Sequence, residues 1–226
     1  RGLIIGYDTR FASEDFAVAV AEVIAGNGIK AYLCPKVTPT PVISFGTLAR
    51  KAGGAVIITA SHNAAIWNGF KYKTEHGASA PDEAISQIEK NISQKFTTGK
   101  ISQVSLGQAA EQGLVEYLDL TPIYLDQVAK LVDLNGLRRA GLKVVVDSMY
   151  GAGAGYLKMI LEEGDIELIE INSERNPLFP GIQPEPIAVN LEQLSHIVKE
   201  QGANVGMATD GDADRMGIVD ERGTFL

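Results

Sequence analysis

Short apolar runs alternate along this chain with segments whose apolar residues recur at helical spacing. The runs at residues 3–7, 29–33, 55–58, 144–146 and 205–209 are mostly apolar and lie between turn residues, which is typical of buried strands. Strands that alternate with helices form parallel sheets covered by helices on their faces. The pattern therefore predicts an α/β fold of α/β/α layers with mixed, mostly parallel sheets.

Helix start signals lie between these runs. Ser13 is a candidate N-cap for a helix whose inner face would carry Phe16, Val20 and Ile24, and Asn190 is a candidate N-cap for a later helix. Further helices are expected to begin at Thr40, Pro81, Pro122 and Tyr156.

The chain is expected to form two domains. Its 226 residues suit one or two domains, and the segment 95–112 is polar and lacks periodicity, as a linker would. The predicted domains are residues 1–105 and residues 106–226.

Charge and cysteine content exclude several classes of protein. The net charge of −8 argues against a nucleic-acid partner that binds through a basic face. No apolar run reaches the roughly 18 residues that span a bilayer, so no membrane partner is expected. Cys34 is the single cysteine and excludes an intrachain disulfide, which favours a reduced, cytoplasmic setting.

Three carboxylates stand at alternate positions between two apolar runs near the end of the chain. Asp210, Asp212 and Asp214 are separated only by the small residues Gly211 and Ala213. Oxygen ligands of this kind suit a hard cation, and without one the three charges would repel each other. The motif predicts a Mg²⁺ site.

Other interpretations of this acidic segment fit less well. An EF-hand would use Glu221 as the ligand at position 12 of its loop, but it requires glycine at position 6, where Arg215 stands, and its flanks would be helices. An aspartate-nucleophile phosphatase would need a second Asp two residues after Asp147, where Met149 stands. A solvated acidic turn rarely needs three evenly spaced Asp.

A serine follows the apolar run 55–58 directly. Ser61 stands where open α/β sheets place their ligands, with His62 and Lys71 as candidate activators of its hydroxyl. Ser61 is also a plausible helix N-cap, and these residues taken alone favour the cap.

Four motifs together resemble the α-D-phosphohexomutase family, which includes phosphoglucomutase and phosphomannomutase. They are Gly-Tyr-Asp-Thr-Arg at 6–10, Thr-Ala-Ser-His-Asn at 59–63, Asn-Gly-Phe-Lys at 68–71 and Asp-Gly-Asp-Ala-Asp-Arg at 210–215. The resemblance runs through essentially the whole chain.

The resemblance implies a phosphoserine mechanism. Ser61 would carry the phosphoryl group, and Mg²⁺ would be held by Ser61 with Asp210, Asp212 and Asp214. Hexose 1-phosphate and hexose 6-phosphate would interconvert through a bisphosphate, with glucose 1,6-bisphosphate as activator.

The resemblance also assigns the charged groups around the serine. Arg10, Lys71 and Arg215 would supply positive charge to catalysis and to substrate binding, and His62 and Lys71 would handle protons. Ala64 replaces the proline that usually follows Ser-His-Asn in the family, which should loosen this loop.

The family has four domains, and this sequence resembles the first two. We therefore expect a monomeric portion of a mutase that lacks domains III and IV of the same protein. Such a chain should bind Mg²⁺ and show little turnover alone. The alternatives are a Mg²⁺-dependent phosphatase or phosphotransferase, and a non-catalytic protein that binds sugar phosphates.

Overall fold

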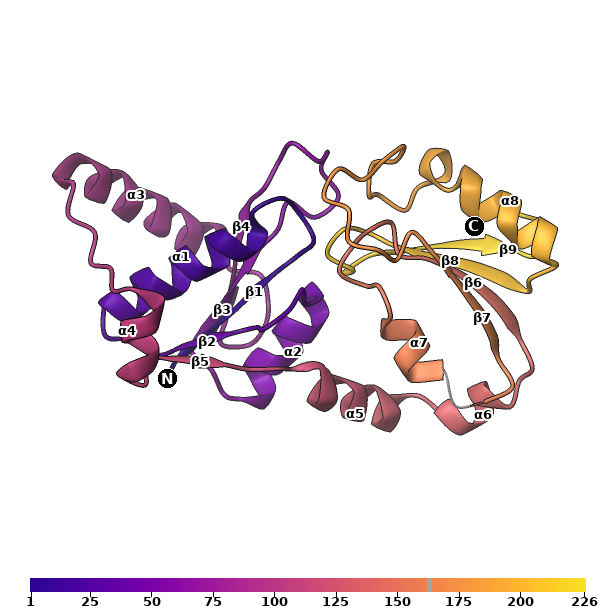
Figure 1. The fold of residues 1–226 in the computed structure, drawn as a ribbon, viewed down its shortest axis with the longest axis horizontal. Coiled ribbons are helices and arrows are strands. Elements are labelled where there is room, and N and C mark those ends of the chain that lie inside the picture. The colour runs from indigo at the N-terminus through magenta and orange to yellow at the C-terminus, as the bar shows by residue number, and fades with distance from the viewer. Residues whose placement is uncertain (162–163) are drawn as a thin grey trace.

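The computed structural model describes residues 1–161 and 164–226. Within these residues the strands form a five-stranded and a four-stranded sheet, which lie side by side along the long axis of the molecule (Figure 1). Both sheets are mostly parallel and carry helices on their faces. The predicted α/β fold with mixed, mostly parallel sheets is confirmed.

The first sheet has the strand order β4-β3-β1-β2-β5, and only β4 runs antiparallel to its neighbour among the described strands. Its strands are β1 (Leu3–Tyr7), β2 (Ala31–Leu33), β3 (Gly54–Ile58), β4 (Phe70–Thr74) and β5 (Val115–Tyr117).

Helices cover both faces of the first sheet. α1 and α4 pack on the face that carries Ile5 and Val56, whereas α2 and α5 pack on the face that carries Ile4 and Ile57. Successive residues of a strand point to opposite faces, so strands buried on both faces are apolar throughout. The helices are α1 (Ser13–Gly26), α2 (Thr40–Ala49), α3 (Asp82–Thr98), α4 (Leu106–Glu111) and α5 (Thr121–Leu131).

The inner face of α1 differs from the predicted one. Ala17, Ala21 and Ala25 are buried against the sheet, whereas Phe16 is 49% exposed. A stripe of small side chains lets the helix approach the sheet closely, and the larger residues lie on its flanks. The prediction gave weight to large apolar side chains and so selected the neighbouring stripe.

Neither predicted N-cap serves as one. Ser13 lies inside α1 and its Oγ donates a hydrogen bond to Asp8 Oδ1 at 2.9 Å, while Ala12 occupies the cap position. Asn190 lies in a 3₁₀ turn, and its Nδ2 donates to the carbonyl oxygen of Glu185 at 2.9 Å. Both side chains instead stabilise the loops that surround the candidate site.

The segment predicted as a linker contains regular structure. α3 extends to Thr98, α4 lies within the segment, and β5 follows it and pairs with β2. The first sheet thus extends beyond residue 105, although the division into two domains stays a prediction. The helix expected to begin at Pro81 is thus confirmed as α3, but its C-terminal end was assigned to a linker because none of its residues is fully buried.

The second sheet has the strand order β7-β6-β8-β9, with β9 antiparallel to β8. α8 packs on one face through Leu194 and Val198, which lie in one core with Val145 and Ala208. The strands are β6 (Lys143–Asp147), β7 (Glu167–Ile171), β8 (Val205–Thr209) and β9 (Met216–Asp220). The helical segments are α6 (Leu134–Arg138), α7 (Tyr156–Leu161), the 3₁₀ turn η1 (Ala188–Asn190) and α8 (Glu192–Gln201).

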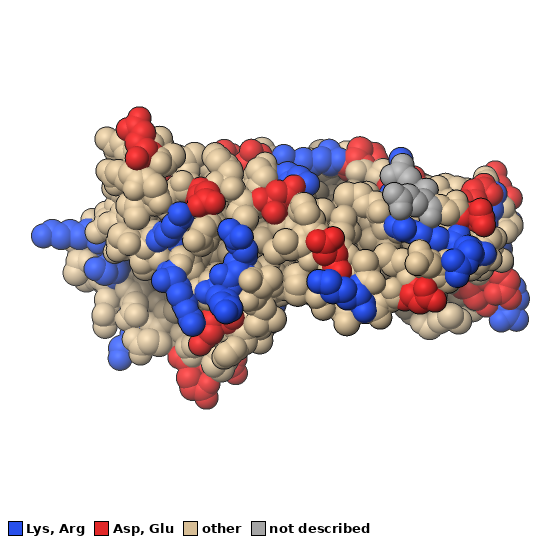
Figure 2. Space-filling model, turned by 90° about the horizontal axis from the view of Figure 1, so that it is seen from below, with Lys and Arg blue, Asp and Glu red and all other residues tan. Residues whose placement is uncertain are grey.

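Charges of both signs are mixed on the surface. On the face shown in Figure 2, Lys and Arg side chains are interspersed with Asp and Glu side chains over both halves of the molecule. Among the helices that the structure describes, none combines the length and the apolar character needed to cross a membrane.

Replacement of Ile57 by Ala tests the assigned core. Ile57 is fully buried in β3, so Ile57→Ala should lower the free energy of unfolding by about 3 kcal/mol. The same change at the half-exposed Ile92 should lower it by about 1 kcal/mol or less. Urea unfolding followed by the fluorescence of Trp67, the single tryptophan, measures both. Equal losses at the two positions would contradict this assignment.

Candidate active site

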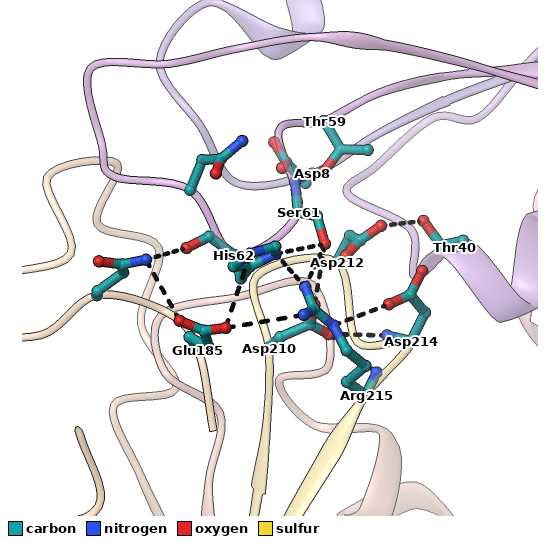
Figure 3. A network of polar contacts seen from close by, with 12 residues as sticks. Asp8, Thr40, Thr59, Ser61, His62, Glu185, Asp210, Asp212, Asp214 and Arg215 are labelled. Carbon is teal, nitrogen blue, oxygen red and sulfur yellow. Dashed lines mark hydrogen bonds and ion pairs between the residues drawn. The ribbon is translucent and has the colours of Figure 1, made fainter. Parts of the chain in front are cut away.

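Most of the predicted site residues meet where the two sheets face each other, as Figure 3 shows for Ser61, His62, Asp210, Asp212, Asp214 and Arg215. Ser61 follows β3, Arg10 follows β1, and the loop 210–215 joins β8 to β9. Lys71 lies on β4 and reaches the same loop. The carboxyl ends of parallel strands form the ligand side of an open α/β sheet, so the topology brings these loops to one place.

Ser61 lies in a strained turn and does not cap a helix. Its φ is 52°, in the left-handed region, and turns rather than a helix follow it. Its backbone N–H donates to Thr59 Oγ1 at 2.8 Å, which holds the turn at the end of β3. The helix-cap interpretation is therefore wrong. A non-glycine residue with positive φ persists only where the surroundings hold it there.

Arg10 binds the backbone of the loop at residues 61–67, called here the serine loop. Its Nη1 donates to the carbonyl oxygens of Ala64 and Trp67, and its Nη2 donates to those of Ser61 and Asn63, at distances of 2.5–2.9 Å. The planar fork of a guanidinium suits this task because its donors diverge in fixed directions. These bonds restrain the loop at the position where Ala64 replaces the family's proline.

The burial of Arg10 defines its role. The side chain is 0% exposed, its Nε lies 3.2 Å from Asp8 Oδ2, and its guanidinium lies 5.0 Å from the centre of the Phe179 ring. Desolvation lowers the pKa of Arg10, although the charge of Asp8 opposes this shift. Arg10 therefore positions the loop. Its predicted contribution to catalysis and to substrate binding stays a prediction.

The three aspartates form a compact group in a hairpin. One carboxylate oxygen from each of Asp210, Asp212 and Asp214 lies within 4.8 Å of the other two. The flanking elements β8 and β9 are strands, which confirms the rejection of an EF-hand. Asp210 and Asp212 are fully buried, whereas Asp214 is partly exposed.

Asp210 connects the hairpin to the serine. Its Oδ1 accepts hydrogen bonds from the backbone N–H groups of Asp214 and Arg215, at 2.9 and 3.1 Å. Its Oδ2 accepts one from Ser61 Oγ at 3.1 Å. Burial raises the pKa of Asp210, and the neighbouring charge of Asp212 raises it further.

Asp212 is bound from the other sheet through a single oxygen. Its Oδ2 accepts hydrogen bonds from Thr40 Oγ1 at 2.6 Å and from Lys71 Nζ at 2.7 Å. Burial alone would raise the pKa of Asp212, but the hydrogen bonds and the charge of Lys71 outweigh it and hold the pKa below its usual value. Its Oδ1 is buried and has no hydrogen-bond partner among the described residues.

These observations fit a hard divalent cation. The donors are all carboxylate oxygens, and Ser61 Oγ lies beside them. A buried carboxylate oxygen without a partner is costly unless something charged or polar binds it, and Asp212 Oδ1 is such an atom. Ser61, Asp210, Asp212 and Asp214 are thus able to hold Mg²⁺.

Arg215 and His62 cover the serine hydroxyl. Arg215 Nη2 donates to Ser61 Oγ at 2.8 Å and also contacts His62 Nδ1. The other ring nitrogen of His62, Nε2, faces Glu185 Oε1 at 3.7 Å.

Sequence reasoning did not identify several of these contacts. Glu185, in the Pro-rich loop, faces His62, and Gly211 lies against the serine loop, where an added Cβ would come within 2.5 Å of the Ser61 carbonyl oxygen. The glycine-rich turn at 151–155 supports the β8–β9 hairpin, since Ala152 N–H donates to the Gly211 carbonyl oxygen at 3.0 Å. Among these contacts, only that of Gly211 had a sequence signal, because this glycine stands between the candidate ligands Asp210 and Asp212.

Family comparisons agree with this geometry. The family model described as phosphoglucomutase/phosphomannomutase, alpha/beta/alpha domain I, matches residues 1–98, and the model for domain II matches residues 122–223. The matches span most of the chain, so the chain belongs to the phosphoglucomutase/phosphomannomutase family. The predicted resemblance is confirmed.

Individual relatives point to the same family. The chain is 34% identical over 224 residues to a Methanosphaera stadtmanae protein provisionally assigned as a phosphoglucosamine mutase, covering 99% of this chain and 47% of that one. It is 31% identical over 225 residues to a Thermococcus kodakarensis phosphoglucomutase/phosphomannomutase, with 99% and 47% covered. The chain spans about half the length of the curated relatives it matches.

A solved structure shows the same fold. The crystal structure of a Thermus thermophilus protein, provisionally assigned as a phosphomannomutase, matches with a TM-score of 0.87 at 35% identity. The match covers 99% of this chain and 49% of that one.

Replacement of Gly211 by Ala tests the contact between the two loops. The added Cβ would meet backbone that cannot yield easily, so Gly211→Ala should lower the free energy of unfolding by about 1–3 kcal/mol. Gly107→Ala is the matched control, because no atom lies within 4 Å of its added Cβ in helix α4. Urea unfolding compares the variants. A Gly211→Ala protein as stable as the control would show that the loops do not approach as described.

Proposed function

We propose that this chain supplies the phosphoserine and the cation site of a mutase that interconverts hexose 1-phosphate and hexose 6-phosphate. The main structural support is the position of Ser61 Oγ, which lies 3.1 Å from Asp210 Oδ2 and 2.8 Å from Arg215 Nη2. A serine hydroxyl held between a carboxylate cluster and a guanidinium suits the transfer of a highly charged group. The family match supports the same chemistry.

The four ligating residues have one task in this proposal. Ser61, Asp210, Asp212 and Asp214 hold the cation at the end of β3 and at the β8–β9 hairpin. Bound Mg²⁺ would offset the negative charge that develops on the phosphoryl group during its transfer.

Lys71 and Arg215 balance the remaining charge. A phosphoserine adds nearly two negative charges beside the three carboxylates. Burial alone would lower the pKa of Lys71, but its hydrogen bond with Asp212 and the charges of Asp212 and Asp214 raise it above the usual value. Lys71 therefore carries its proton at rest, and Lys71 and Arg215 both contact the carboxylate cluster beside Ser61.

Each phosphoryl transfer also moves one proton. The oxygen–phosphorus bond of phosphoserine 61 breaks while a sugar hydroxyl forms a new bond to phosphorus and loses its proton. We assign proton handling to His62 and Lys71. His62 Nδ1 lies 3.5 Å from Ser61 Oγ, and Lys71 Nζ lies 2.7 Å from Asp212 Oδ2 in the carboxylate cluster. The bisphosphate then turns over and returns its other phosphate to Ser61, and glucose 1,6-bisphosphate serves as activator.

The complete reaction needs more than these two sheets. We propose that domains III and IV of the same protein read the sugar and bind its distal phosphate, which is supported by the share of its relatives that the chain spans. The relatives carry the names phosphoglucosamine mutase, phosphoglucomutase and phosphomannomutase, so a hexose phosphate is the proposed substrate class. We propose a monomer in the cytoplasm, with domains at residues 1–105 and 106–226.

Covalent labelling tests the proposal. The chain is incubated with glucose 1,6-bisphosphate and Mg²⁺, its intact mass is taken, and any added phosphoryl group is placed by peptide sequencing. We expect one phosphoryl group, on Ser61. Ser61→Ala should abolish the gain, whereas Ser93→Ala, on the exposed helix α3, should leave it unchanged.

Other outcomes would select the alternatives. Steady release of inorganic phosphate without a labelled Ser61 would favour a Mg²⁺-dependent phosphatase or phosphotransferase. Sugar-phosphate binding that Ser61→Ala leaves intact, with no phosphoryl gain, would favour a non-catalytic binding protein.

A further inference from the structure

Thr40 begins helix α2, which packs on the first sheet, and its side chain contacts the β8–β9 hairpin of the second sheet. Both of its polar donors bind the same residue: Oγ1 donates to Asp212 Oδ2 at 2.6 Å, and the backbone N–H donates to the Asp212 carbonyl oxygen at 2.9 Å. Thr40 is only 2% exposed. Thr40 is shielded from solvent and contacts the candidate metal ligand Asp212, so it can act on the site only through Asp212.

The two ends of the Asp212 carboxylate have different environments. Oδ2 is occupied by Thr40 and Lys71, whereas Oδ1 is buried without a hydrogen-bond partner among the described residues. Two donors on one oxygen prevent the carboxylate from rotating. The oxygen left over is then held in one orientation, as a ligand to a cation would need to be.

The contact is specific to Thr40. Thr47 lies about two turns further along α2 and is equally buried, but its Oγ1 donates to the carbonyl oxygen of Ile43 in the same helix at 2.9 Å. Removal of the Thr47 hydroxyl therefore changes the helix without affecting the hairpin. This provides a matched control within one element.

We infer that Thr40 is a positioning residue that orients Asp212, so that the first sheet sets the cation affinity of carboxylates carried by the second. The inference rests on the proposed cation site. By linkage the dependence is reciprocal: a cation bound to the hairpin stabilises the contact between the two sheets.

Cation binding to four variants tests the inference. The free Mn²⁺ signal in electron paramagnetic resonance is followed while Mn²⁺ is titrated into the 226-residue chain. Thr40→Val removes the hydroxyl and keeps the backbone donor, so Mn²⁺ should bind about tenfold more weakly or worse. Thr40→Ser should restore most of the affinity, Thr47→Val should match the unchanged chain, and Asp212→Asn should abolish tight binding.

Stability measurements separate positioning from general damage. Mn²⁺ should raise the melting temperature of the unchanged chain and of Thr47→Val by similar amounts, and that of Thr40→Val by less. If Thr40→Val does not fold, Thr40→Ala removes the same hydroxyl with less steric demand.

Different results would contradict the positioning role of Thr40 and the proposed cation site. Equal Mn²⁺ affinity in Thr40→Val, Thr47→Val and the unchanged chain, with binding lost in Asp212→Asn, would overturn the positioning role and leave the cation site intact. Absence of Mn²⁺ binding in the unchanged chain, or binding that Asp212→Asn does not affect, would remove the cation site and the inference with it.

Discussion

The Asp212 carboxylate, buried between the two sheets and hydrogen-bonded by Thr40 and Lys71, is the interaction on which the site depends. An ionised carboxylate without exposure to water requires charged or hydrogen-bonding partners. Asp212 lies in the hairpin of the second sheet, but the side chains that bind its Oδ2 come from the first half of the chain: Lys71 from β4 and Thr40 from helix α2, which packs on the first sheet. The serine also comes from the first sheet and the other carboxylates from the second, so neither sheet contains a complete site.

The serine loop is held as firmly as the hairpin that it faces. Arg10 is buried beneath it with four hydrogen bonds to its carbonyl oxygens, and Ser61 keeps a left-handed φ of 52°. Gly211 lets the hairpin approach the Ser61 carbonyl oxygen, since a side chain there would overlap it. Restraint of both loops holds the hydroxyl at its place between Asp210 and Arg215, and such preorganisation limits the rearrangement that a charge transfer requires.

The sequence predicted the elements that carry a strong local signal. Strands β1, β6 and β8 follow from their apolar runs, and the three aspartates converge as their alternate spacing indicated. β4 and β5 were not predicted because they are partly exposed edge strands that depend on pairing with β3 and β2. The burial of Arg10 and the hydrogen bond between Thr40 and Asp212, 172 positions apart, depend on tertiary structure. The local sequence around an arginine or around a threonine at a helix start does not indicate such contacts.

A crystal structure with Mn²⁺, located by its anomalous scattering, tests most directly whether the two sheets build one cation site. We expect one peak at the β8–β9 hairpin, in contact with Asp212 Oδ1 and with oxygens of Asp210, Asp214 and Ser61, while Thr40 and Lys71 keep their bonds to Asp212 Oδ2. A hairpin without a peak in crystals grown with saturating Mn²⁺, or a cation bound there while Ser61 faces away, would contradict it.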